Sequence, residues 1–148
     1  MKSETSSPIK KDHKTQIVVR WDELDPNNHV NNKNFQGYLD EARMRAMRDW
    51  GFSMEKLRNE GFGPIILSIQ LEFKREIAYP ETIRIESDLF LKSPTRAVFK
   101  QRIICGSNQA LSCNASTDWV ILNLNSKRPA KFLEAIGLPQ STLEFFKI

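Results

Sequence analysis

DPNNHVNNKNFQGYLDEARMRAMRDWG, residues 25–51, decides the fold of this chain of 148 residues. Its first eight residues include four asparagines, an aspartate and one of the two histidines of the chain. Apolar residues then recur at helical spacing as far as Trp50, which predicts a single long helix. Asn31 and Asn32 are natural cap residues for its start, and Gly51 is a natural stop.

The sequence on either side of this helix predicts strands. Residues 15–21 are rich in β-branched residues and predict a strand, and residues 53–60 predict a short second helix. The apolar period changes from Pro64 onward. Because consecutive long strands with short turns form an antiparallel sheet, the expected fold class is α+β, a long central helix wrapped by an antiparallel five-stranded sheet. The last four strands are expected at residues 65–75, 82–91, 97–105 and 111–124.

The organisation of the chain indicates one domain. Residues 1–12 are polar and lysine-rich, which is typical of a disordered tail. Residues 13–148 have the length of one domain with its own core, and short helices are expected near residues 130–137 and 141–148. A single layer of sheet would leave its edges open, so we expect a homodimer or a homotetramer.

Composition argues against several classes of function. The net charge of +4 is dispersed and forms no basic stripe, so nucleic acid is not an expected partner. No stretch approaches the ~20 apolar residues of a membrane span, and the start lacks the apolar run of a signal peptide, which predicts a cytoplasmic protein. The two histidines lie far apart without well-spaced carboxylate or cysteine partners, so a metal site is not expected.

The polar stretch contains the parts of a site for acyl chemistry. Asp25 can serve as a base or a nucleophile, and His29 can move protons near neutral pH or orient a neighbour. The helix start near Asn31 and Asn32 offers free backbone N–H groups and a partial positive charge, which stabilise a developing oxyanion. The same residues also suit a plain turn and helix cap, because Asp-Pro often begins a turn and asparagine tolerates left-handed conformations.

Two motifs resemble a known family. Residues 25–35, DPNNHVNNKNF, resemble the active-site segment of hotdog-fold thioesterases of the 4-hydroxybenzoyl-CoA thioesterase type. They are still more similar to the segment D-x-N-x-H-V-N-N-x-x-Y of plant acyl-ACP thioesterases. Residues 71–76, LEFKRE, resemble the L-E-Y-R-R-E segment of those plant enzymes. The order of strand, loop, long helix and sheet also matches the hotdog fold, so the resemblance covers roughly residues 14–125.

This resemblance implies an acyl-CoA or acyl-ACP thioesterase that needs no cofactor. Asp25 would be the nucleophile or the general base, and the backbone N–H of Asn32 would form the oxyanion hole. Asn27 and His29 would orient the carbonyl, the water or Asp25. Glu76 would act through water or hold His29.

Three positions depart from the family pattern. Ile77 stands where the plant enzymes often have cysteine, which removes any scheme with a cysteine nucleophile. Asn28 replaces the glycine that bacterial relatives usually have before the histidine, and asparagine can adopt the positive φ of that turn. Phe35 replaces the usual tyrosine, which loses a hydroxyl and keeps the packing.

Two other functions stay open as alternatives. One is a hotdog dehydratase or hydratase acting on 3-hydroxyacyl thioesters, and the other is a non-catalytic acyl-CoA-binding module. The HVNN sequence and the Glu76 segment favour hydrolysis. Trp21, Trp50, Met44 and Met47 could line an acyl pocket or simply pack in the core. The basic residues that could hold the phosphates of CoA or contact a carrier protein are Lys74, Arg75, Arg96, Lys100, Arg102, Lys127 and Arg128.

Overall fold

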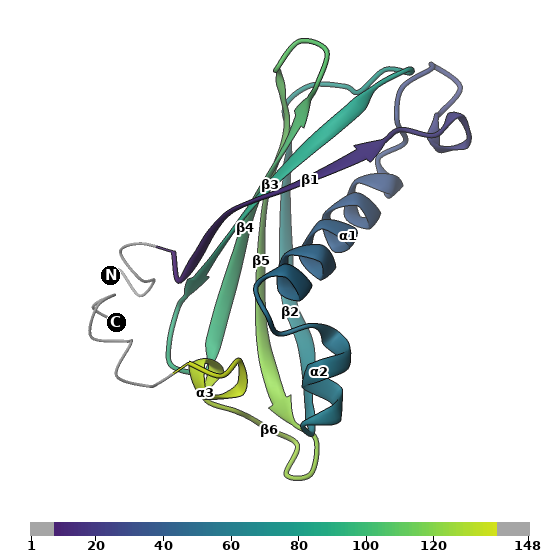
Figure 1. Ribbon diagram of the computed structural model, residues 1–148. Coiled ribbons are helices and arrows are strands. Elements are labelled where there is room, and N and C mark those ends of the chain that lie inside the picture. Colours follow the sequence, from purple (N-terminus) through teal and green to yellow (C-terminus); the bar gives the residue numbers. More distant parts are fainter. Residues whose placement is uncertain (1–7, 139–148) are drawn as a thin grey trace.

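The computed structural model describes residues 8–138, in which a twisted sheet partly surrounds one long helix (Figure 1). The strands are β1 (Lys10–Val18), β2 (Phe62–Phe73), β3 (Thr82–Leu91), β4 (Arg96–Cys105), β5 (Leu111–Asn123) and β6 (Arg128–Pro129). The helices are α1 (Lys33–Asp49), α2 (Met54–Asn59) and α3 (Phe132–Ala135), and a single 3-10 turn covers Trp21–Glu23.

The sheet has the order β1-β3-β4-β5-β2, with every pair of neighbours antiparallel and β6 paired to the end of β5. Chain neighbours β3, β4 and β5 are also neighbours in the sheet, because the short turns between them allow only hairpins. The two edge strands are therefore β1 and β2. The expected α+β fold with five long strands is confirmed, and the two-residue β6 is too short to show a period in the sequence.

Helix α1 lies across one face of the sheet (Figure 1) and turns its apolar stripe toward it. Phe35, Tyr38 and Leu39 pack with Ile83 and Ile85 of β3 in a cluster near the start of the helix. Burial of each large apolar side chain contributes about 1.5–3 kcal/mol relative to exposure. A second cluster, around the end of the helix, combines Met47, Phe52, Leu57, Phe99, Trp119, Ile121 and Phe132. Among residues 8–138, no helix has the length and apolar character needed to span a bilayer.

The start of the domain differs from the prediction. Strand β1 begins at Lys10, so the expected boundary of the tail at residue 12 is wrong, and β1 ends before Trp21. The first half of β1 is an edge segment that joins β3 through its backbone. Its Lys11 and Lys14 are exposed and its Lys10 is half-buried, so its sequence carries no apolar alternation. Trp21 is 73% exposed and does not join Met44 and Met47. The rest of the expected tail, residues 1–7, and the helix expected at residues 141–148 lie outside the described residues.

Candidate active site

The loop between the 3-10 turn and α1 folds around the carboxylate of Asp25. Its Oδ1 accepts hydrogen bonds from the backbone N–H groups of Asn27 at 2.9 Å and His29 at 3.1 Å. The N–H of Asp25 donates to the His29 carbonyl at 2.7 Å. Asn28 has a φ of 64°, which confirms that asparagine adopts the positive φ expected of this turn. Within residues 8–138 no hydrogen bond reaches Oδ2, so this oxygen is left available for chemistry.

The start of α1 presents one free donor. Asn31 caps the first turn, because its Oδ1 accepts the N–H of Lys33 at 3.1 Å and its carbonyl accepts the N–H of Asn34 at 2.9 Å. The N–H of Asn32 has no acceptor in the described part of the chain. It lies at the positive end of the helix dipole, where a partial negative charge is stabilised.

The segment after β2 brings Glu76 to the loop. Val30 donates its N–H to the carbonyl of the fully buried Ile77 at 2.7 Å, and His29 forms an isolated bridge with Ala78. The Oε2 of Glu76 lies 3.2 Å from Nε2 of His29. The structure thus brings Glu76 next to the imidazole of His29, and its role there stays a prediction.

Four of the five expected site residues line one cavity of about 350 Å³: Asp25, His29, Asn32 and Glu76. This volume is within the range of small-molecule sites. Asn27 does not line the cavity, and its contact with Asp25 is through its backbone N–H. The remaining wall is made by Val30, Phe35, Phe73, Lys74 and Arg75.

The geometry suits attack on a carbonyl carbon. The same cavity is lined by Asp25 and Asn32, whose Oδ2 and N–H have no partner among the described residues, and by His29 with its neighbour Glu76. A positioned carboxylate can activate water or attack directly, and a preorganised N–H can stabilise the oxyanion that forms. In the described residues, no group of three or more histidine, cysteine, aspartate or glutamate side chains is arranged as metal ligands.

Comparison with known protein families gives a match over residues 19–139, which is most of the chain, to the thioesterase-like superfamily. The chain belongs to this superfamily. The expectations of a hotdog-fold thioesterase family and of a thioester hydrolase are thereby confirmed, while the 4-hydroxybenzoyl-CoA type in particular stays a resemblance.

Solved structures similar to this thioesterase-like chain include a DHNA-CoA thioesterase of Staphylococcus aureus, with 21% identity, a TM-score of 0.75, and coverage of 90% of this chain and 88% of that one. The protein SAV2348 of Staphylococcus aureus, solved in complex with CoA, has 15% identity, a TM-score of 0.79 and coverage of 97% and 89%. An acyl-ACP thioesterase of Bacteroides thetaiotaomicron has 16% identity, a TM-score of 0.73 and coverage of 79% and 48%. At these identities the likeness shows the fold alone.

Glu23 and Tyr38 support the site, and sequence reasoning missed both. The Glu23 carbonyl accepts the N–H of Asn31 and the side-chain amide of Asn34, both at 2.9 Å. Its Oε1 accepts the hydroxyl of Tyr38 at 2.7 Å and the N–H of Arg20 at 2.8 Å. Glu23 therefore ties the site loop to the first turns of α1. The only signal in the sequence is the position of Asn34 and Tyr38 on one helix face.

The contact between Tyr38 and Glu23 predicts an unusual titration. Burial, the hydrogen bond to Glu23 and its negative charge raise the pKa of Tyr38 far above its ordinary value. Because the folded state favours the neutral phenol, the stability from this group is complete below about pH 10, the pKa of a free tyrosine, and is lost as pH rises above it. The chain has two tyrosines, so the Tyr79→Phe variant keeps Tyr38 alone and reports on it. In this variant we expect tyrosinate absorbance to appear only together with alkaline unfolding.

Reversible titration of Tyr38 near pH 10 in the folded protein would show that the Tyr38–Glu23 contact is absent in solution. The Tyr38→Phe variant is the control, because it keeps the ring and removes the ionisable hydroxyl. Its free energy of unfolding should fall less steeply on the alkaline side than that of Tyr79→Phe.

Proposed function

We propose that this protein hydrolyses an acyl-CoA or acyl-ACP thioester to a free acid and a thiol, with Asp25 and the N–H of Asn32 as the reacting groups. The observation that carries this proposal is the shared cavity. Asp25 is held through Oδ1, and within residues 8–138 neither its Oδ2 nor the N–H of Asn32 has a hydrogen-bond partner. Both residues line the same cavity. Membership of the thioesterase-like superfamily agrees with this chemistry.

The reaction follows from the positions of these groups. The thioester carbonyl oxygen accepts the hydrogen bond of the Asn32 N–H. With Asp25 as a base, Oδ2 takes a proton from water while the water oxygen attacks the carbonyl carbon. The tetrahedral oxyanion collapses and the C–S bond breaks. The leaving thiolate takes the proton that Oδ2 of Asp25 received from water. With Asp25 as a nucleophile, Oδ2 attacks the carbonyl carbon, the C–S bond breaks and the thiolate leaves to take a proton from water. Water then hydrolyses the resulting mixed anhydride, which releases the acid and restores the carboxylate.

His29 and Glu76 act as positioning residues in this scheme. The backbone N–H of His29 donates to Oδ1 of Asp25 at 3.1 Å. Oε2 of Glu76 lies 3.2 Å from Nε2 of the His29 ring and holds the ring in place. Lys74 and Arg75 also line the cavity and supply positive charge. A CoA phosphate or an acidic carrier protein is the matching charge on the thiol side of the substrate.

The two edges of the sheet differ in a way that favours a dimer through β2. Edge strand β1 is protected by exposed charged residues and by a bulge at Asp12, which has a φ of 60°. Such features block pairing with another sheet. On β2, by contrast, Ile65, Ile66 and Leu67 are 44%, 47% and 45% exposed. We propose that β2 pairs with β2 of a second copy, which brings the partner close to Phe73 and the site cavity.

We predict that Leu67→Lys gives a monomer with strongly reduced kcat/KM, because two charges would meet at the centre of a symmetric contact. Sedimentation velocity measures the mass, and thiol release measures the activity. The matched control is Val18→Lys on the other edge, where the side chain is already 69% exposed; this variant should keep the wild-type mass. A Leu67→Lys protein with the mass of the wild type would show that β2 is not the interface.

The hydratase alternative places the same carboxylate and imidazole next to the acyl chain. Thiol release from saturated acyl-CoAs, followed with a colour-forming thiol reagent, separates the two reactions, because a hydratase changes the absorbance of the double bond and releases no thiol. Binding of acyl-CoA with neither reaction would support the non-catalytic module. The present proposal requires thiol release.

A further inference from the structure

A second cavity lies between α1, α2 and the strands β2, β4 and β5. It measures about 110 Å³. It shares no lining residue with the cavity that Asp25, His29, Asn32 and Glu76 line, which we call the catalytic cavity. Its wall is mainly apolar and contains three methionines, Met44, Met47 and Met54, together with Phe99 and Trp119. Methionine side chains adapt to ligands of varied shape. We call this space the α1–β5 cavity.

One wall of the α1–β5 cavity carries a buried positive charge. Arg43 is 5% exposed, and its guanidinium donates to Oε1 of Gln101 at 3.1 Å, to Oγ1 of Thr117 at 3.4 Å and to Oδ1 of Asp40 at 3.3 Å. Burial lowers the pKa of Arg43, and the charge of Asp40 acts in the opposite direction. Because Arg43 is already paired with Asp40, the site suits a neutral polar ligand better than an anion.

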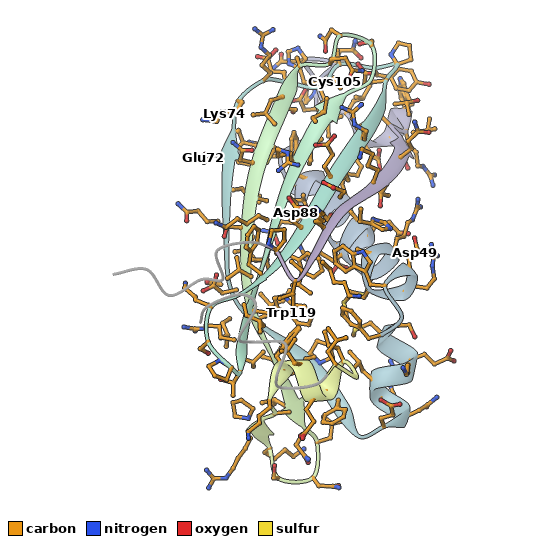
Figure 2. The ribbon with its side chains drawn as sticks, turned by 60° about the vertical axis from the view of Figure 1, so that its left-hand side comes forward. Asp49, Glu72, Lys74, Asp88, Cys105 and Trp119 are labelled. Carbon is orange, nitrogen blue, oxygen red and sulfur yellow. The ribbon has the colours of Figure 1, made fainter. Side chains whose placement is uncertain are left out.

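Trp119 contributes a donor without an acceptor. Among residues 8–138 its buried Nε1 has no hydrogen-bond partner, and no other buried side-chain nitrogen or oxygen of this part of the chain is in that position. The indole stacks on Phe99 with centroids 5.5 Å apart and meets Phe132 of α3 edge-on at 5.0 Å. Figure 2 shows Trp119 at the end of the sheet where α3 lies, far from Glu72 and Lys74 at the edge near the catalytic cavity. A buried donor of this kind costs stability unless a ligand atom accepts from it.

The two cavities contact α1 at different positions along its length, one at Asn32 and Phe35 and the other between Asp40 and Met47. The axial distance from Asn32 to Arg43 is about 16 Å at the rise of an α-helix. An extended chain advances roughly 1.2 Å per bond, so an acyl group of about twelve to fourteen carbon atoms would reach from one to the other. Strand β2 contributes an apolar side chain to each cavity. Phe73 lines the catalytic cavity and is 50% exposed, and Ile66 lines the α1–β5 cavity and is 47% exposed.

We propose that the α1–β5 cavity binds the far end of the acyl chain and selects chains of this length that carry a neutral oxygen there, a hydroxyl or a keto group. The oxygen accepts the hydrogen bond of Trp119 Nε1, and the methionines enclose the methylene groups before it. This inference rests on the proposed thioesterase function, because the chain is placed from the carbonyl at Asn32.

The test compares dodecanoyl-CoA with ω-hydroxydodecanoyl-CoA as substrates for thiol release. We expect kcat/KM to be about tenfold higher for the hydroxylated chain, the effect of one hydrogen bond to an otherwise unpaired buried donor. The Trp119→Phe variant, which removes the N–H and keeps an aromatic ring, should bring the ratio close to one. Trp50→Phe is the matched control, because Trp50 stacks on the other side of Phe99 at 6.0 Å and does not line the cavity; it should keep the preference.

A binding measurement gives an answer even without turnover. The three tryptophans give three indole N–H resonances, and Trp119→Phe assigns one of them. The free ω-hydroxydodecanoic acid should shift the Trp119 resonance further than dodecanoic acid does. Equal shifts, or equal kcat/KM for the two CoA esters, would overturn the selection of an oxygenated chain while leaving the thioesterase proposal intact. Absence of thiol release from every ester would contradict the thioesterase proposal instead, and the resonance shifts would then decide the binding claim alone.

Discussion

Asp25→Asn is expected to lower kcat for thioester hydrolysis by about 10²–10⁴-fold, the range that a positioned acid or base contributes. Asparagine cannot take a proton from water and is a far weaker nucleophile than a carboxylate. Its side-chain oxygen can still accept the N–H groups of Asn27 and His29, which hold Oδ1 in the native loop. The loop and the melting temperature should therefore change little, and the loss should fall on kcat.

The matched control is Asp22→Asn, three residues earlier in the chain. Asp22 is 64% exposed and pairs only with Arg20, at 3.3 Å, among the described ion pairs. Its replacement removes the same charge near the same loop and should leave kcat within a factor of about two, since an exposed pair contributes little. An equal loss in both variants would mean that the local charge, and not the Asp25 carboxylate, supports activity.

Asn32→Pro is expected to lower kcat by about 10²–10³-fold, the loss measured when one oxyanion donor is removed. The φ of Asn32 is −51°, close to the value that proline requires. Its N–H has no acceptor within residues 8–138, so the substitution removes no native hydrogen bond that the structure describes. The KM should change less than kcat, because the N–H acts most strongly on the charge that develops during the reaction.

Asn32→Ala separates the backbone from the side chain. The Asn32 side chain makes no capping hydrogen bond, so alanine should retain most of the activity and all of the backbone donor. Circular dichroism and the melting temperature check that both variants keep α1. A proline variant that is folded and as active as the alanine variant would rule out this N–H as the oxyanion donor.

The bounds of an interior strand of the sheet could be predicted from the sequence, whereas those of the edge strand β1 could not. The bounds of β3, Thr82–Leu91, coincide with the prediction, because this strand alternates buried and half-exposed residues along its length. Strand β1 is an edge strand that pairs through its backbone from Lys10 onward, and its lysines show no such alternation. Periodicity reports which side chains are buried, so a segment held by backbone pairing alone leaves no trace in it.

The site shows the same division between local and distant contacts. Asp25, His29 and Asn32 lie within one loop, so their common cavity could be predicted from spacing and resemblance. The position of Glu76 depends on a bridge between His29 and Ala78, a contact that only a resemblance could suggest. The tie between Glu23 and Tyr38 spans fifteen residues and belongs to no periodic pattern, so the sequence alone could not reveal it.

The decisive measurement for Asp25 as the catalytic group is thiol release by the wild type and by Asp25→Asn, measured side by side. The substrates are a panel of acyl-CoAs from acetyl to palmitoyl together with benzoyl-type esters. We predict turnover of at least one ester by the wild type and its near-complete loss in the folded variant. Turnover that persists in Asp25→Asn at the wild-type rate would contradict the assignment of the Asp25 carboxylate as the catalytic group.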